Sequence, residues 1–65
     1  MTEKPNYAAM TVNERLYTAG LLGAFDHAAR SRNRARMIEI LTEVEVGSPD
    51  KTADAIIANP RKYGY

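Results

Sequence analysis

Apolar residues recur at helical spacing in the first half of the chain. From Tyr17 to Ala28 they follow one another at intervals of one, three or four positions, which places them along one face of an α-helix. Most charged residues nearby fall outside this face, as they do on a helix that packs against a core. The pattern predicts a first helix over residues 11–30, with these residues inward: Tyr17, Leu21, Ala24, Phe25 and Ala28.

The start of this helix carries a capping signal. Thr11 is followed three positions later by Glu14, the spacing of a capping box, in which each side chain accepts a backbone N–H of the first turn. Asn13 is an alternative cap. Gly20 and Gly23 lie inside the predicted helix, where each costs about 1 kcal/mol relative to alanine. We expect these glycines to permit close helix packing.

A second helix is predicted over residues 33–45. Either Ser31 or Asn33 can cap it, because both side chains accept a backbone N–H of the first turn. Glutamate and threonine take the outer side of this helix. Its apolar face consists of Met37, Ile40, Leu41 and Val44.

A third helix is predicted over residues 49–58. Ser48 is its expected cap and Pro49 its first residue, a position where the missing N–H of proline is not needed. The helix ends before Pro60, because the residue that precedes a proline disfavours the α conformation. We expect the tail that follows to pack back on the bundle through its two tyrosines.

The predicted fold class is therefore all-α. It is a single three-helix domain over residues 11–65, preceded by a flexible leader over residues 1–10. A second, smaller apolar strip lies nearly opposite the first on the opening helix, and it consists of Val12, Leu16 and Ala19. A lone three-helix domain has little use for such a strip. We expect a partner protein, a second copy of the chain or the folded-back leader to cover it.

Size and composition limit the possible functions. A chain of 65 residues forms one domain with a small core, and 45% hydrophobic with 26% charged residues is ordinary for a globular protein. No stretch approaches the ~20 apolar residues that span a bilayer. The first residues lack the apolar segment of a secretory signal. The chain contains no cysteine, which excludes disulfides and thiolate metal sites and leads us to expect a cytoplasmic location.

Positive charge is concentrated between the first two predicted helices. Four arginines stand there at alternate positions, in a chain whose formal net charge is only +1: Arg30, Arg32, Arg34 and Arg36, here called the arginine run. Cations at a helix N-terminus oppose the macrodipole, so stability alone does not explain the run. Guanidinium groups bind carboxylates and phosphates, which makes an acidic protein surface or a nucleic acid the candidate target. The alternative is a solvated turn whose arginines pair with Asp26, Glu39 or Glu43.

Catalysis finds little support in the residue types. His27 is the only histidine, and no cysteine is present to form a nucleophile–base pair with it. Glu39 and Glu43 lie one helical turn apart, but two carboxylates make a poor metal site. No glycine-rich phosphate loop is present. We expect no enzymatic activity, no cofactor, no metal ion and no small-molecule substrate.

Four short segments carry a resemblance to other proteins. They are Met-Thr-Val-Asn-Glu-Arg-Leu at residues 10–16, Leu-Leu-Gly-Ala-Phe-Asp at 21–26, Arg-Ala-Arg-Met-Ile at 34–38 and Asn-Pro-Arg-Lys-Tyr-Gly at 59–64. Through them, residues 10–65 resemble a group of short, uncharacterised bacterial helical proteins. The resemblance implies that residues 1–9 are an extension, and it implies no activity.

These observations favour a small, non-enzymatic protein-interaction module, such as an adaptor, regulator or inhibitor of a larger bacterial or phage-related machine. Its expected partner is a protein, bound through an acidic surface or by self-association, and not a membrane. The alternative is nucleic-acid binding through the arginine run. The second and third predicted helices have the spacing of a helix-turn-helix, but Asp50 and Asp54 on the third would repel a phosphate backbone. The candidate contact residues are Arg30, Arg32, Arg34, Arg36, Val12, Leu16 and Ala19.

Overall fold

A computed structural model describes residues 6–65, which form helices and no strands. The elements are η1 (Tyr7–Ala9), α1 (Val12–Thr18), α2 (Leu22–Arg30), α3 (Arg34–Glu43), α4 (Pro49–Ala58) and η2 (Pro60–Tyr63), where η denotes a 3-10 helix. The all-α prediction is confirmed for this part of the chain. The predicted number of three helices is wrong, because the structure divides the first predicted helix into α1 and α2.

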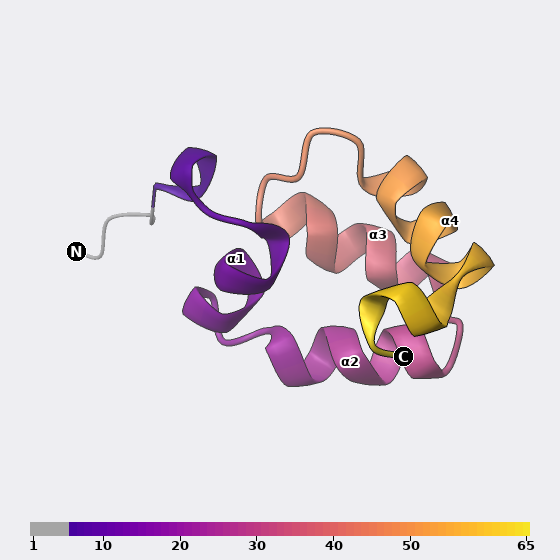
Figure 1. Ribbon diagram of the computed structural model, residues 1–65. Helices are drawn as coiled ribbons and strands as arrows, with labels where there is room; N and C mark the ends of the chain where they lie inside the picture. Colours follow the sequence, from indigo (N-terminus) through magenta and orange to yellow (C-terminus); the bar gives the residue numbers. More distant parts are fainter. Residues whose placement is uncertain (1–5) are drawn as a thin grey trace.

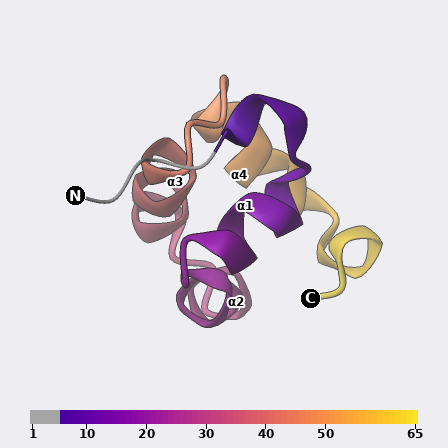
Figure 2. The same cartoon turned by 90° about the vertical axis from the view of Figure 1, so that its left-hand side faces the viewer.

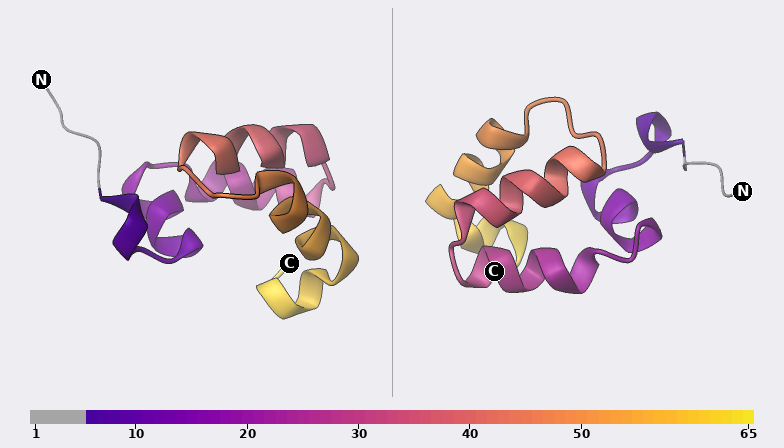
Figure 3. Two further views of the ribbon diagram at one scale, coloured as in Figure 1. Left: turned by 90° about the horizontal axis from the view of Figure 1, so that it is seen from above. Right: turned by 180° about the vertical axis from the view of Figure 1, so that it is seen from behind.

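The helices surround one core. Figure 1 shows α2 and α3 running across the molecule one above the other, with α1 at one end and α4 crossing steeply at the other. In Figure 2 the tail and the C-terminus lie on the opposite side of the molecule from α3. The right-hand view of Figure 3 shows α3 nearest the viewer, so α3 forms the back of the molecule as drawn in Figure 1.

The helix α1 ends where the backbone becomes left-handed at Gly20, with a φ of +73°. The N–H of Leu21 donates to the carbonyl oxygen of Leu16 at 2.8 Å, and that of Gly20 donates to Tyr17 at 3.0 Å. This is the Schellman pattern, in which glycine avoids the strain of other residues. Our expectation of close packing is wrong for both glycines, since a Cβ added at Gly20 or Gly23 would meet no atom of the described chain within 4 Å.

The break at Gly20 changes which side of α1 faces the core. Leu16 is 0% exposed, whereas Tyr17, which the continuous helix placed inward, is 75% exposed. Val12 and Ala19 are half-buried and pack against the core. Of the covers expected for the strip of Val12, Leu16 and Ala19, the chain itself supplies the one that buries Leu16, without a partner or a second copy. Because α1 is a separate helix, its direction is independent of α2, and this strip turns inward.

The segment before α1 joins the same core. Tyr7 is 7% exposed and belongs to the buried cluster, and Met10 packs against that cluster. The flexible leader predicted over residues 1–10 thus differs from the structure at residues 6–10, where the chain is packed. Residues 1–5 lie outside the described residues.

The predicted helix starts agree more closely with the structure. The Thr11 hydroxyl accepts the N–H of Glu14 at 3.2 Å, and the Glu14 carboxylate accepts the N–H of Thr11 at 3.0 Å, so the capping box is complete. Asn33 rather than Ser31 caps α3, because its side-chain oxygen accepts the N–H of Arg36 at 3.2 Å. Both caps satisfy backbone donors that the first helical turn leaves free.

The last helix and the tail follow the prediction in part: of the two tyrosines expected to pack back on the bundle, Tyr65 does so, whereas Tyr63 is exposed. The helix α4 spans Pro49–Ala58, although the Ser48 side chain makes no capping hydrogen bond within the described chain. After η2 the backbone turns again, and the N–H of Tyr65 donates to the carbonyl of Pro60 at 2.9 Å. The Tyr65 ring meets Phe25 edge-to-face, with ring centroids 6.1 Å apart. The tail is therefore packed back on the bundle.

Candidate functional site

Two members of the arginine run pair with carboxylates of their own helices. Arg30 Nε lies 3.1 and 3.0 Å from the two carboxylate oxygens of Asp26 in α2. Arg36 pairs with Glu39 in α3. Their spacings of four and three residues are those at which side chains meet on a helix surface. Both pairs are exposed to solvent, so each adds little to stability.

The other two members of the run reach across to α4. Arg34 donates from Nε and Nη2 to the two carboxylate oxygens of Asp54, at 2.6 and 3.2 Å. The hydrogen bond from Arg34 lowers the pKa of Asp54, and the same bond raises the pKa of Arg34. Arg32 has a left-handed backbone, with φ of 55°, and its Nη1 donates to the carbonyl oxygen of Ile57 at 3.2 Å.

The arginine run therefore acts as a set of contacts within the chain. Asp26 and Glu39 were among the partners that the sequence suggested, whereas Asp54 was not. A phosphate group that approached the run would compete with carboxylates already bound to it.

Arg15, which sequence reasoning did not single out, links α1 to the end of α3. Its Nη1 donates to the carbonyl oxygens of Val44 at 3.3 Å and Glu45 at 2.9 Å, and its Nε donates to Met10 at 3.2 Å. The carbonyls at the end of α3 lack helical partners, and a cation there also suits the helix macrodipole. No local pattern marks this contact, because Val44 and Glu45, just after α3, lie 29 and 30 residues away.

Three large apolar side chains are exposed in the described part of the chain. Tyr17 is 75% exposed, Leu22 39% and Tyr63 43%. Tyr17 and Leu22 border one shallow hollow, and Leu22 and Tyr63 border the next. Asn13 lines both hollows, so the three side chains share one side of the molecule. We call Tyr17, Leu22, Tyr63 and the intervening Asn13 the aromatic face.

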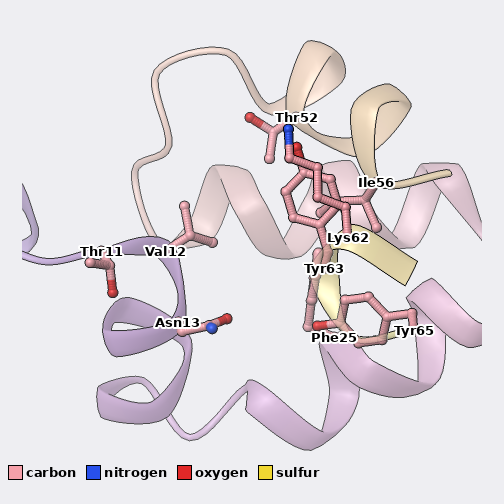
Figure 4. Close-up of a pocket in the computed structure, with 9 residues that line it drawn as sticks. All are labelled: Thr11, Val12, Asn13, Phe25, Thr52, Ile56, Lys62, Tyr63 and Tyr65. Carbon is pink, nitrogen blue, oxygen red and sulfur yellow. The ribbon is translucent and has the colours of Figure 1, made fainter. Parts of the chain in front are cut away.

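A cavity of about 310 Å³ adjoins the aromatic face (Figure 4). Phe25 and Ile56, which are 1% and 4% exposed, lie at its base. The start of α1 lies on one side of the cavity, and α4 and the tail lie on the other. Tyr63 borders both the cavity and the neighbouring hollow. The remaining residues that line the cavity are Thr11, Val12, Asn13, Thr52, Lys62 and Tyr65.

Tyr65 forms a fixed wall of this cavity. Its ring contacts Phe25, and the guanidinium carbon of Arg30 lies 5.6 Å from the ring centroid. Arg30 also donates to the carbonyl oxygen of Gly64 at 3.5 Å. Burial raises the pKa of the Tyr65 phenol, and the charge of Asp26 acts in the same direction, whereas the charge of Arg30 opposes it. One member of the arginine run thus holds the tail against α2.

The residues weighed for catalysis or metal binding are not brought together. His27 is exposed on α2, and Glu39 is paired with Arg36. Residues 6–65 contain no group of three or more histidine, cysteine, aspartate or glutamate side chains placed to hold a metal ion. Among the helices of this region, none has the length and apolar character needed to cross a membrane. No family model, curated protein or solved structure matches the chain.

Proposed function

We propose that the chain is a non-enzymatic protein-binding module that docks a partner on the aromatic face. The observation that carries the proposal is that the exposed large apolar side chains of the described residues gather on one side: Tyr17, Leu22 and Tyr63. Burying such side chains supplies free energy of association, and tyrosine is enriched at the interface positions that dominate affinity. An adaptor, regulator or inhibitor in the cytoplasm fits this chemistry and the absence of cysteine.

The aromatic face is suited to binding because its parts are preformed. Tyr17 lies on α1, Leu22 opens α2, and Tyr63 lies in η2. All three elements surround one core, so a partner does not have to order them. The arginine run is less suited to binding a partner, because its side chains already bond to carboxylates and carbonyls of the same chain.

Site-specific photo-crosslinking in the source cells tests the proposal. A benzophenone amino acid replaces Leu22 in one variant and Tyr63 in a second. In the control variant it replaces Ala35, which is exposed on α3, the helix that forms the back of the molecule (Figure 3). We expect the same adduct mass from the first two variants and none from the control. Adding Tyr17→Asp is expected to remove the adducts while circular dichroism shows unchanged helix content.

Several outcomes would overturn the proposal. Adducts that also form from Ala35, or that persist with Tyr17→Asp, would place the contact elsewhere. The absence of adducts from both Leu22 and Tyr63 would remove the aromatic face as a docking surface. An adduct of twice the chain mass would identify the partner as a second copy of the chain.

A further inference from the structure

We infer that the cavity beside the aromatic face receives an aromatic side chain of the partner, and that an acidic residue next to that side chain binds Lys62. The inference rests on the proposed function and specifies the segment that docks. The partner then presents a short acidic–aromatic stretch of polypeptide. Its aromatic ring enters the cavity, and its flanking chain crosses the aromatic face.

The cavity walls suit an aromatic ring. Phe25 and Ile56 lie at the base, and Tyr63 and Tyr65 stand beside them. The rings of Phe25 and Tyr65 already meet at an interplanar angle of 67°, so an incoming ring would extend an existing edge-to-face cluster. The volume of about 310 Å³ stands at the small end of ligand pockets, which span roughly 300–1,000 Å³. It fits one large side chain better than an extended cofactor.

The charge at the rim of the cavity favours an acidic residue next to the partner's aromatic side chain. Among the described side chains that line the cavity, that of Lys62 is the only charged one. Its ammonium nitrogen lies 5.8 Å from the centroid of the Tyr63 ring. No carboxylate of residues 6–65 forms an ion pair with Lys62. A carboxylate at the rim would therefore gain a cation that no carboxylate of the described chain already pairs with.

The other cations of the described chain differ from Lys62 in their contacts. Five already donate to oxygen atoms of the same chain: Arg15, Arg30, Arg32, Arg34 and Arg36. Lys51 and Arg61 make no such bond within residues 6–65, but neither lines the cavity. Lys62 is thus the cation that a partner carboxylate can bind at this cavity without displacing an oxygen atom of the same chain.

Two uncharged polar side chains face each other across the cavity. Asn13 comes from α1 and Thr52 from α4, on opposite sides in Figure 4. An amide and a hydroxyl both donate and accept hydrogen bonds, as a peptide backbone requires. Asn13 also lines the hollows bordered by Tyr17 and Leu22. A chain that leaves the cavity past Asn13 therefore reaches the aromatic face directly.

Synthetic peptides test the inference on the full chain. Three acetylated and amidated peptides share a glycine–serine background and differ only at their centre, which reads Asp-Phe-Asp, Lys-Phe-Lys or Asp-Ser-Asp. Each is titrated into ¹⁵N-labelled protein, and the amide shifts report both site and affinity. We expect Asp-Phe-Asp to bind tightest and to move the signals of Thr52, Ile56, Lys62 and Tyr63. Serine in place of phenylalanine is expected to weaken binding at least about tenfold, and lysine in place of aspartate about threefold or more.

Variants of the protein test separately the charge of Lys62 and the shape of the cavity. Lys62→Glu is expected to reverse the preference, so that Lys-Phe-Lys binds more tightly than Asp-Phe-Asp. Lys51→Glu is the matched control, since it makes the same charge change on an exposed residue outside the cavity. It is expected to keep the preference for the acidic peptide. Thr52→Trp fills the cavity from α4 and is expected to abolish the phenylalanine-dependent binding, with helix content unchanged by circular dichroism.

The inference is overturned if binding is independent of phenylalanine, if it is equal for both charges, or if the shifts map to the arginine run. It is also overturned if no peptide binds at millimolar concentration. The two proposals fail separately. If crosslinks form from Leu22 and Tyr63 but the peptides show no preference, the proposed docking face stands and only the inference about the cavity fails. Missing crosslinks would remove the docking face whatever the peptides do.

Discussion

The Arg15 guanidinium donates a hydrogen bond of 2.9 Å to the backbone carbonyl of Glu45, a residue 30 positions further along the chain. The bond joins α1 to the turn that follows α3. At that turn the backbone is left-handed, with φ of 61° at Glu45. Arg15 therefore connects the first helix to the middle of the chain at a point where α3 has carbonyl groups to satisfy.

Arg15→Met is expected to lower the free energy of unfolding by about 1–3 kcal/mol. The methionine keeps an apolar stem, but the part-buried carbonyls lose their charged donor. Urea denaturation followed by circular dichroism measures the change. Arg61→Met is the control, because Arg61 is exposed and its side chain makes no hydrogen bond within residues 6–65; we expect an effect below about 0.5 kcal/mol. Equal losses in the two variants would contradict a structural role for Arg15.

Neighbouring residues of α1 are expected to respond differently to truncation. Leu16→Ala opens a void in the core and is expected to cost about 2–5 kcal/mol, much of the stability of so short a chain. Tyr17→Ala removes a ring that is 75% exposed, and we expect a loss below about 1 kcal/mol. Thermal unfolding measures both. A larger loss of stability for Tyr17→Ala than for Leu16→Ala would mean that Tyr17 faces the core, as predicted for one continuous helix.

The two glycines near the break are expected to respond with opposite signs. Gly20→Ala forces alanine to a φ of +73°, and we expect it to destabilise the fold by about 1–2 kcal/mol. Gly23 lies within α2, where an added methyl group meets no described atom within 4 Å. Gly23→Ala is expected to stabilise the fold by up to about 1 kcal/mol. Calorimetric melting of both variants checks the signs, and stabilisation by both would contradict the left-handed end of α1.

Stability is expected to fall at alkaline pH because of Tyr65. Burial raises the pKa of its phenol above the ordinary value of 10.0, so the folded chain holds this proton more tightly than the unfolded chain. The resulting stabilisation is complete below pH 10.0 and is lost as the pH rises through the folded pKa. Tyr65→Phe is expected to flatten this decline in urea midpoints measured against pH. The same flattening by Tyr17→Phe, which alters an exposed ring, would contradict the assignment to Tyr65.

Helix starts could be predicted because their signals are local. The capping box at Thr11 and the proline at position 49 lie within a few residues of the turns they specify. The end of α1 could not be predicted in the same way. A glycine among apolar residues at helical spacing is compatible with a helix interior and with a left-handed helix terminus. At Gly20 the packing of α1 on the core decides between the two.

The candidate site was less predictable because its contacts are distant in sequence. The charge of the arginine run is visible in the residues, but Asp54 lies 20 positions from Arg34, and only the approach of α3 and α4 brings them together. The aromatic face was missed because a continuous helix turns Tyr17 inward. No local pattern relates Tyr17 to Tyr63, which reaches the same side of the molecule through the folding of the tail.

The tail from Pro60 to Tyr65 supplies one wall of a cavity whose base belongs to α2 and α4. Because these segments are distant in sequence and meet only in the folded chain, a partner that occupies the cavity would recognise the tertiary arrangement and no single stretch of sequence. Thermodynamic linkage then requires that such a ligand raise the melting temperature as its concentration rises. In the proposed docking, recognition and structural integrity are thereby coupled, and we expect an incompletely assembled chain not to be bound.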